Sequence, residues 1–597
     1  MKIGIEIHQR LDTSKLFCDC PTRIEEDEKP KLSIRRRLHP VLSELGEVDE
    51  ASQSEFAKGR LFTYQVFGRN NCLVETDEEP PKTLNEEALR IALQVAAQLH
   101  AKPVDEVHLM RKMVIDGSNT SGFQRTAVVA ISGHMSSSKG TIGIPLIAVE
   151  EESAGIVSSS DSEVVYRLDR LGIPLIEITT TPDIKDGAHL VEVAEKLGMM
   201  LRATGRVARG LGTIRQDVNI STEGGARVEL KGAQDLRLLP KFVEIEEKRQ
   251  LELVKIILEL RAKKALQPKK EPKDVTVLFK DTRAGILAAG IKAGDAVLAQ
   301  KLPSHNTILG REIQPGKRYG TELSDYARKA GVKGIIHSDE SMEKYGISKE
   351  EVSALRKELG MDADDAFIMV VAPKQQGEAA LGYALERASM DRVPEETRRA
   401  NPDGTSSFMR PLAGRARLYP ETDVPPLRIS KEFMDSVVVG ESLDEKKTKL
   451  QTLLNKEMAG RMLKSRNLHI FEKLAEGGAE PMLAATTLED TLISLRREGL
   501  EFADLENTLL EMFAEYKKGT FVKAAIPEVL KGMAKGARIE AVLKVYRLQK
   551  LAGKELEKVI AECGYDMVQV MQKCRLQADP AEVAAIIKKS KASSGYV

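Results

Sequence analysis

The sequence predicts an α+β protein that ends in an all-helical region. Apolar runs of about six residues, bounded by Gly, Pro and Thr, are typical of buried strands and occur repeatedly up to Lys231. Short apolar strands, predicted at Val275–Phe279, Ile335–Ile336 and Phe367–Ala372, alternate with helical patterns over residues 274–393, which indicates a compact α+β module. From Ser442 onward, apolar residues recur at helical spacing with little Pro.

Length and composition set the class of protein. A chain of 597 residues predicts roughly three to five domains. Lys+Arg and Asp+Glu both number 90, so any surface that binds nucleic acid must be local. Five cysteines do not make a disulfide framework, and no apolar run reaches membrane-spanning length. We therefore expect a cytoplasmic multidomain protein.

Apolar and polar residues alternate in the N-terminal stretch, as they do in a half-buried strand. Ile3, Ile5 and Ile7 fall on one face, with Glu6 and His8 on the other. Glu6 and His8 therefore project from the same side, a geometry suited to sharing a ligand. A lone histidine is nevertheless more often structural.

Cysteines follow this strand as one close pair, Cys18 and Cys20, and a single Cys72. A structural zinc site usually takes four ligands in two close pairs. The pattern therefore favours the absence of a zinc site.

The segment from Pro145 to Asp183 organises the chain. It places Glu150, Glu151 and Glu152 at the end of a predicted strand and Glu177 inside a second apolar run. A buried carboxylate is costly unless a cation or partner compensates it, and gathered carboxylates suit magnesium. The alternative is a solvated strand end with a salt-bridged Glu177.

The segment from Arg111 to Gln124 runs from a basic strand end into a loop rich in Gly, Ser, Asn and Thr. Such loops can hold phosphate through backbone N–H groups and hydroxyls. The chain has no GxxxxGK[ST] sequence, so a P-loop is not expected. The candidate nucleotide-binding residues of this segment are Arg111, Lys112, Ser118, Thr120 and Ser121.

Two paired strands are predicted over residues 212–220 and 227–231. Arg215, Asp217 and Asn219 share one face of the first strand, and Lys231 ends the second. Such a polar row could line a cleft or simply face water. Helices are predicted over residues 85–100, 189–202, 241–264 and 321–330.

A positive excess marks the C-terminal region. Residues 531–591 contain 13 Lys/Arg against 7 Asp/Glu, a net of +6 by subtraction. Arg547, Lys550, Lys554 and Lys558 would form one stripe if their helix is continuous, whereas a helix break at Gly553 would leave a patch. Either arrangement suits a phosphate backbone, and a solvated helix face is the alternative.

Several stretches together resemble one family. GIEIHQRL, KLFCDC, RKMVIDGSNTSGFQRT, EEESAG, YRLDRLGIPLIEI, IRQDVNIS and VELKGAQDL are similar, in order, to motifs of the GatB/GatE family, the kinase subunits of tRNA-dependent amidotransferases. The similarity resumes with PEETRR, SSFMRP and RLYPETDVPPL. The module between them resembles the insertion that separates the archaeal-type E branch from the B branch.

The resemblance implies the fold and its divisions. It implies an antiparallel-sheet cradle domain, similar to glutamine synthetase, at residues 1–273 and 394–430. It also implies an inserted aspartyl-tRNA-synthetase-like domain at 274–393, a helical domain at 431–525 and a tRNA-binding tail at 526–597.

The resemblance also implies the activity. The family uses ATP and Mg²⁺ to phosphorylate the γ-carboxylate of Glu carried on tRNA(Gln), and ammonia then displaces phosphate to give Gln-tRNA(Gln). Ammonia is expected from a separate glutaminase, the D subunit, in a heterodimer or a dimer of heterodimers. This chain has no recognisable ammonia-producing site, since Thr179-Thr180-Thr181 lies inside a matched segment.

Site residues follow by matching motifs. His8, a carboxylate of EEESAG (Glu151 or Glu152) and Glu396 resemble the magnesium ligands of the family, and Glu6 and Asp217 resemble a second cation site. Glu177 and Lys231 lie in matched segments and join the expected catalytic set, while Arg215 and Asn219 join the expected nucleotide site. The zinc motif of some B subunits, which consists of two pairs of cysteines, is only half present here, and this departure argues against a zinc role.

Two other functions compete with this one. The chain could be a non-catalytic scaffold that only presents tRNA, but a scaffold has no need of a carboxylate cluster. It could also be a B subunit with dual Asn/Gln activity, against which the insertion argues.

Overall fold

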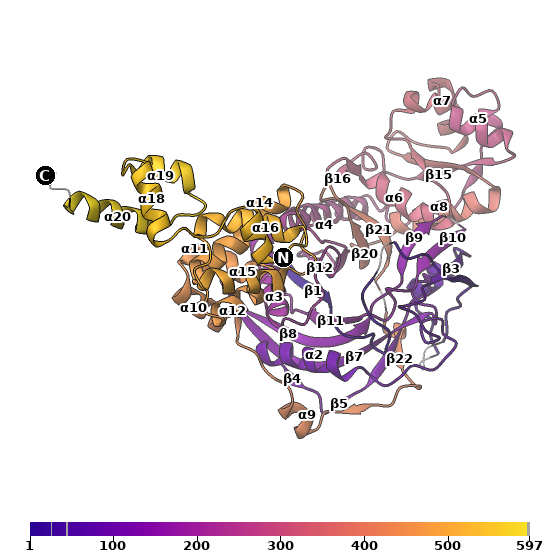
Figure 1. Cartoon of the computed structure of the whole chain (residues 1–597). Coiled ribbons are helices and arrows are strands. Elements are labelled where there is room, and N and C mark those ends of the chain that lie inside the picture. Colours follow the sequence, from indigo (N-terminus) through magenta and orange to yellow (C-terminus); the bar gives the residue numbers. More distant parts are fainter. Residues whose placement is uncertain (25–26, 43–45, 161, 413, 594–597) are drawn as a thin grey trace. The chain divides into compact units, whose positions relative to one another are not determined.

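The computed structural model describes residues 1–24, 27–42, 46–160, 162–412 and 414–593 (Figure 1). The chain divides into two compact units, Met1–Gly440 and Glu441–Val597. The first unit is a mixed structure with mainly antiparallel sheets, and the second is helical. This agrees with the predicted class, whereas the cradle layout and the division into four domains stay predictions.

The main sheet of the first unit has eleven strands, in the order β21-β20-β13-β12-β1-β11-β8-β7-β6-β22, with β4 paired to β7. Its neighbours are antiparallel except for the parallel pair β13 and β20. The strands are β1 (Lys2–Arg10), β4 (Lys102–Pro103), β6 (Leu109–Met113), β7 (Phe123–Ser137), β8 (Gly140–Glu151), β11 (Pro174–Thr179), β12 (Ile214–Ser221), β13 (Val228–Lys231), β20 (Glu396–Ala400), β21 (Ser406–Pro411) and β22 (Leu418–Pro420).

Side-chain alternation gives this sheet one apolar and one polar face. Ile3, Ile5 and Ile7 are at most 1% exposed, while Glu6 and His8 lie on the other face and are half-buried. Helices α2 (Glu86–Gln98), α3 (Gly187–Ala203) and α4 (Leu239–Ala262) pack against the sheet and confirm three predicted helices (Figure 1). The polar face is therefore left for a functional site.

Smaller elements flank the main sheet. A four-stranded sheet has the order β2-β3-β10-β9, and β23 pairs with β5. These elements are β2 (Leu32–Arg36), β3 (Leu61–Val66), β5 (Glu106–Val107), β9 (Gly155–Ser159), β10 (Glu163–Arg167), β23 (Leu427–Arg428), α1 (Glu50–Phe56) and α9 (Lys431–Asp435).

The predicted module at 274–393 contains its own sheet, in the order β14-β15-β19-β18, and the hairpin β16-β17. Its elements are β14 (Lys273–Asp274), β15 (Ala296–Leu302), β16 (Glu312–Gln314), β17 (Lys317–Arg318), β18 (Ile336–His337), β19 (Ala366–Ala372), α5 (Gly285–Lys292), α6 (Tyr319–Ala327), α7 (Lys349–Glu358) and α8 (Lys374–Ala388). The predicted strand at Val275–Phe279 is wrong, since Thr276–Phe279 forms a 3₁₀ turn. Short apolar runs do not distinguish a strand from a helical turn.

Part of the core of this module is shared with α4. Leu253, Ile256 and Leu260 of α4 join one buried cluster with Leu298 and Leu381 of β15 and α8. The apolar contacts therefore continue across the predicted boundary between residues 273 and 274.

The second unit consists of helices. They are α10 (Leu443–Leu453), α11 (Lys456–Lys464), α12 (Leu468–Glu476), α13 (Pro481–Thr486), α14 (Leu492–Arg497), α15 (Leu505–Lys517), α16 (Ile526–Ala534), α17 (Ile539–Val545), α18 (Gly553–Glu562), α19 (Met567–Cys574) and α20 (Pro580–Ser593). A capping box begins α10: the Ser442 hydroxyl accepts from the N–H of Glu445, and the Glu445 carboxylate accepts from the N–H of Ser442. Among the described residues, no helix is both long and apolar enough to cross a membrane.

Candidate active site

Ionisable side chains gather on the polar face of the main sheet. Strand pairing sets His8 of β1 opposite Glu177 of β11, and Glu6 opposite Asp217 of β12. His8 Nε2 lies 3.3 Å from Glu6 Oε1 and 3.6 Å from Glu177 Oε2. The prediction that Glu6 and His8 project from one side is confirmed.

Glu150 of β8 completes this group. It lies opposite Leu175, on the same face as Glu177, and its Oε2 is 3.7 Å from His8 Nε2. Its Oε1 accepts a hydrogen bond of 3.0 Å from Lys112 Nζ. We call Glu6, His8, Glu150 and Glu177 the His8 cluster.

A second group adjoins it on β12 and β13. Lys231 Nζ lies 2.7 Å from Asp217 Oδ2 and 2.9 Å from Glu229 Oε1. The N–H of Gly232 donates to Asp217 Oδ1 at 3.1 Å, which fixes the carboxylate. We call Asp217, Glu229 and Lys231 the Lys231 group.

Both groups contain residues that suit a divalent cation. Glu6, His8 and Glu177 offer ligand atoms that all lie within 4.8 Å of one another, and so do Glu6, Asp217 and Glu229. Glu6 is shared between the two sets. Carboxylate oxygens with one imidazole fit a hard cation such as Mg²⁺, so the donor chemistry agrees with the expected cofactor.

Burial and neighbouring charges shift the pKa values of Glu6 and His8 in the His8 cluster. Burial, with the charge of Glu177, raises the pKa of Glu6 to about 7. Burial alone would lower the pKa of His8, but the hydrogen bond to Glu177 and the charge of Glu6 raise it to about 9. His8 is therefore protonated at neutral pH when no metal is bound, and a cation bound at its Nε2 must displace this proton.

Glu152 is on the same face but is neutralised by arginines. Its carboxylate accepts hydrogen bonds from Arg10 Nε at 2.9 Å and from Arg215 at 2.5 Å. Burial opposes its ionisation, yet Arg215, Arg170 and Arg10 lower the pKa of Glu152. Arg215, expected at the nucleotide, thus contacts a carboxylate beside the His8 cluster.

Glu151 faces away from His8, because alternation puts it on the opposite face from Glu150. It accepts hydrogen bonds from the N–H of Arg125 at 2.9 Å and from the Arg125 guanidinium at 3.3 Å. The carboxylate of the EEE run that contacts His8 is therefore Glu150, and the expected role of Glu151 as a magnesium ligand stays a prediction.

Glu396 also lies away from the His8 cluster. It pairs in register with Val228, which pairs with Ile220, and this row belongs to the apolar face. It is fully buried, and its carboxylate bonds to Arg249 at 2.9 Å and to Arg398 at 2.5 Å. Glu396 therefore lies on the opposite sheet face from His8, and its expected role as a magnesium ligand stays a prediction.

The predicted phosphate loop contacts other parts of the chain. Arg111 pairs with Glu421 and Asp423, and Thr120 Oγ1 donates to the carbonyl of Glu75 at 2.8 Å. The Ser121 hydroxyl donates to Asn119 Oδ1 at 2.9 Å, and the Ser118 N–H to Asp116 at 2.9 Å. Of these predicted residues only Lys112 bonds to the His8 cluster, because alternation sends Arg111 to the other face.

Other polar residues of this face are placed by register. Asn219 lies between Gly4 and Glu229 on the face of the Lys231 group, as predicted. Glu229 was not predicted, although its spacing of two residues from Lys231 puts both on one face. Gln124, also missed, donates to Glu150 Oε2 at 3.2 Å. Nothing local in the sequence indicates this contact, which depends on the pairing of β7 with β8.

The four basic residues Arg547, Lys550, Lys554 and Lys558 do not lie on one continuous helix. Helix α17 ends at Val545, Arg547 has a positive φ of 52°, and α18 begins only at Gly553. Lys554 and Lys558 are exposed on α18, whereas Lys550 pairs with Glu582. The alternative with a helix break near Gly553 is therefore the observed one.

Comparisons with known proteins support one family. The model of the GatB/GatE catalytic domain matches residues 1–435. The chain is 45% identical over 585 residues to the E subunit of the glutamyl-tRNA(Gln) amidotransferase of Pyrococcus furiosus, covering 96% of this chain and 92% of that protein. It is 45% identical to the protein of the same name in Methanocaldococcus jannaschii, covering 99% and 98%. The protein of this name in Sulfurisphaera tokodaii is 42% identical, covering 99% and 98%.

Proposed function

Because the chain belongs to the GatB/GatE family, we propose that it catalyses the tRNA-dependent amidation named for its relatives, as the subunit that activates Glu-tRNA(Gln). The observation that carries this proposal is the His8 cluster beside the Lys231 group. The carboxylates and imidazole of these two groups, together with Lys112 and Lys231, lie on the polar face of the main sheet, opposite the face on which the helices pack.

The reaction needs an activated carboxylate. The γ-carboxylate of the Glu residue on tRNA attacks the γ-phosphorus of ATP, and the bond from that phosphorus to ADP breaks. Ammonia then attacks the carbonyl carbon, a C–N bond forms, and phosphate leaves with the former carboxylate oxygen. Phosphoryl transfer asks the protein mainly for positioning and for neutralisation of charge.

Named side chains can meet both requirements. Glu6, Glu177, Asp217 and Glu229, with His8 in its neutral form, would hold Mg²⁺. When bound, Mg²⁺ would neutralise and orient the phosphate oxygens of ATP.

Two lysines sit at the edges of this set. Burial alone would lower the pKa of Lys112 and of Lys231, yet Glu150 and Asp217 respectively raise it. Both therefore stay protonated and can face the negative charge of ATP.

A separate subunit would supply ammonia. The three threonines at 179–181 are engaged in the sheet: Thr179 donates to Glu177 at 3.3 Å, Thr180 Oγ1 accepts from the N–H of Ile5 at 2.9 Å, and Thr181 bonds to Gly143 and Asp183. Hydroxyls held in this way are poorly placed to act as nucleophiles. A partner glutaminase and a cytoplasmic heterodimer therefore remain part of the proposal.

Incubation of the purified chain with ATP, Mg²⁺, ammonium and Glu-tRNA(Gln) tests the proposal. We expect Gln-tRNA(Gln), and ADP formation that requires Glu-tRNA(Gln). Glu244→Gln, an exposed change on α4, is the control that should keep the wild-type rate. tRNA binding without any product, even with ammonium supplied, would favour the scaffold function instead.

A further inference from the structure

A cavity of about 460 Å³ borders the polar face of the main sheet. Its walls come from both ends of the strand order, β20 and β21 at one end and the segments beside β6 and β22 at the other, and from α1, β9 and β10. Cavities of this size are typical of sites for small molecules. Five basic and three acidic side chains line it, which gives a net charge of +2 by subtraction.

The acidic side chains of the cavity are engaged elsewhere. Asp49 caps the first turn of α1. Asp116 accepts a hydrogen bond from the N–H of Ser118 at 2.9 Å, and Glu55 pairs with Lys58. Within the described ranges, none of these three carboxylates forms an ion pair with an arginine. The positive charge of the cavity is therefore not neutralised from inside.

Two of the arginines lie beside the Lys231 group. Arg399 of β20 is opposite Lys231 in register. Arg410 of β21 is opposite Thr397, whose hydroxyl donates to Glu229 at 2.9 Å. Both arginines therefore project from the polar face of the sheet. In the part of the chain that the structure describes, neither has an ion pair or a side-chain hydrogen bond.

Arg417 enters the cavity from the other end of the strand order. Its Nε donates to the carbonyl of Met113 at 3.1 Å, and this is its only side-chain hydrogen bond among the described residues. Burial, with the charge of Arg410, lowers the pKa of Arg417. The Nε of Arg60, in the same lining, is buried and has no partner among the described residues. An anion bound here would offset both the desolvation and the repulsion of these guanidinium groups.

Phosphate is the anion that suits this arrangement. The planar fork of a guanidinium group matches phosphate oxygens with two parallel hydrogen bonds. The two arginines predicted for the nucleotide already have carboxylate partners, since Arg111 pairs with Glu421 and Arg215 with Glu152. The unpaired arginines of the cavity are freer to bind a ligand, and Arg399 adjoins candidate ligands of Mg²⁺ in the Lys231 group.

We propose that Arg399, Arg410 and Arg417 bind the triphosphate of ATP. This inference rests on the proposed function, because that reaction brings a triphosphate to the carboxylates of the polar face. Mg²⁺ neutralises only part of the charge of a triphosphate, and the guanidinium groups would neutralise the rest. The acceptor end of tRNA is the other source of phosphate, so the test measures the binding of each separately.

Equilibrium dialysis of the full-length chain with Mg²⁺ and AMP-PNP, an ATP analogue that is not hydrolysed, tests the site without turnover. We expect Arg399→Gln and Arg410→Gln each to weaken AMP-PNP binding by about 10- to 100-fold. Inorganic tripolyphosphate should show the same loss, because it contains no base. Arg392→Gln, a change at a side chain that is 89% exposed before β20, is the matched control and should bind as the wild type does. Arg410→Lys keeps the charge but not the planar fork, so it should recover only part of the loss.

Chemical modification of the unaltered chain keeps the test decisive if a variant fails to fold. Mg²⁺ with AMP-PNP should protect Arg399 and Arg410 from phenylglyoxal, as mapped by mass spectrometry, and should leave Arg392 unprotected. Equal modification of Arg399 and Arg410 with and without AMP-PNP would overturn the inference. Variants that lose tRNA affinity in filter binding but keep AMP-PNP affinity would overturn it too.

The inference and the proposed function fail in different ways. Wild-type protein that forms Gln-tRNA(Gln), with variants that bind AMP-PNP normally, would overturn the role of the arginines alone. Wild-type protein that binds AMP-PNP through these arginines but forms no Gln-tRNA(Gln), even with ammonium supplied, would support the site and contradict the proposed function.

Discussion

His8 of β1 and Glu177 of β11 face each other across directly paired strands, with Nε2 and Oε2 3.6 Å apart. Their contact links two segments 169 positions apart by subtraction of their numbers. It also gives the candidate site its charge balance, because the hydrogen bond to Glu177 helps to keep His8 protonated.

Glu177→Gln should reduce ATP-dependent amidation by at least about 100-fold, because it removes a charge that acts on the bound cation. The change nearly preserves shape, so tRNA affinity should stay within about twofold of the wild type. Single-turnover amidation and tRNA filter binding check the two parts. A wild-type rate in this variant would contradict a role for the His8 cluster.

Glu150→Gln should affect catalysis, whereas Glu151→Gln should affect stability. Glu150 contacts His8 and Lys112, so its change should lower kcat strongly. Glu151 contacts Arg125, so its change should lower Tm and leave kcat nearly intact at a temperature where the variant is folded. Kinetics and thermal melts measured side by side distinguish the two variants. The opposite pattern would show that Glu151, rather than Glu150, acts in the active site.

Glu396→Gln should act on stability. Glu396 is fully buried among Arg249 and Arg398, and removal of one partner from a buried ion pair costs about 3–5 kcal/mol. The Mg²⁺ dependence of the remaining activity should match the wild type. A raised Mg²⁺ requirement would show that Glu396 reaches the metal after all.

In a chelator, the contribution of Glu6 and His8 to the stability of the first unit should fall as pH rises from about 5 to about 9. The folded-state pKa of Glu6 is raised to about 7, so its ionisation costs stability between its ordinary value and 7. The folded-state pKa of His8 is raised to about 9, so its contribution is present below its ordinary value and is lost as pH rises through 9. Thermal melts across this range check the slope.

Glu6→Gln is the control for that slope. It should flatten the lower part of the decline, because the group that titrates near pH 7 is gone. Mg²⁺ should raise Tm more at pH 8 than at pH 6, since both ligands must lose their protons. A Tm in chelator that does not change with pH would contradict the assigned charge states.

Lys554→Gln/Lys558→Gln should weaken tRNA binding and make its salt dependence shallower, by about 1 to 2 in the log–log slope. Lys550 is left unchanged because it pairs with Glu582. Lys447→Gln/Lys456→Gln removes the same charge from exposed positions on α10 and α11, and should keep the wild-type slope. Equal slopes of the salt dependence in all three proteins would show that Lys554 and Lys558 belong to a solvated surface that does not contact tRNA.

The local features of this protein can be predicted from its amino-acid sequence alone. The alternation of Ile3, Ile5 and Ile7 with Glu6 and His8 reflects the two-residue period of a strand. This period can be recognised without knowing which strand pairs with it. Helices α2, α3 and α4 followed from their apolar spacing, and the matched motifs indicated the family. These patterns extend over only a few residues, so they can be recognised without knowing which strands pair.

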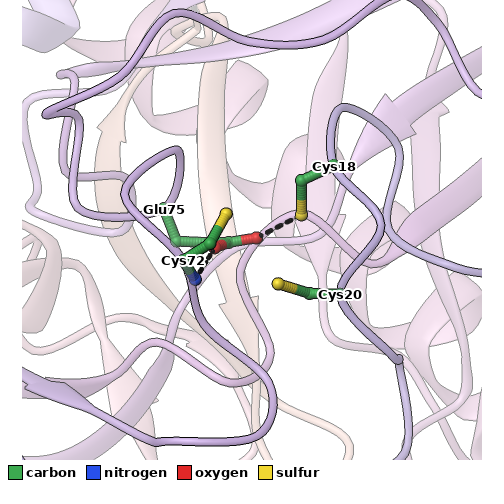
Figure 2. A group of neighbouring side chains, drawn as sticks. All are labelled: Cys18, Cys20, Cys72 and Glu75. Atoms are coloured by element: carbon green, nitrogen blue, oxygen red, sulfur yellow. Dashed lines mark hydrogen bonds between the residues drawn. The ribbon is translucent and has the colours of Figure 1, made fainter.

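Which side chains contact one another depends on the pairing of distant segments. Glu150 rather than Glu151 reaches His8 because the register of β8 against β11 fixes which face each carboxylate occupies. Glu396 lies away from the cluster because its strand joins the sheet with this side chain toward α4. Cys72 and Glu75 join Cys18 and Cys20 across more than fifty residues of chain (Figure 2). Register and loop placement depend on contacts summed over the whole sheet, and no local pattern encodes them.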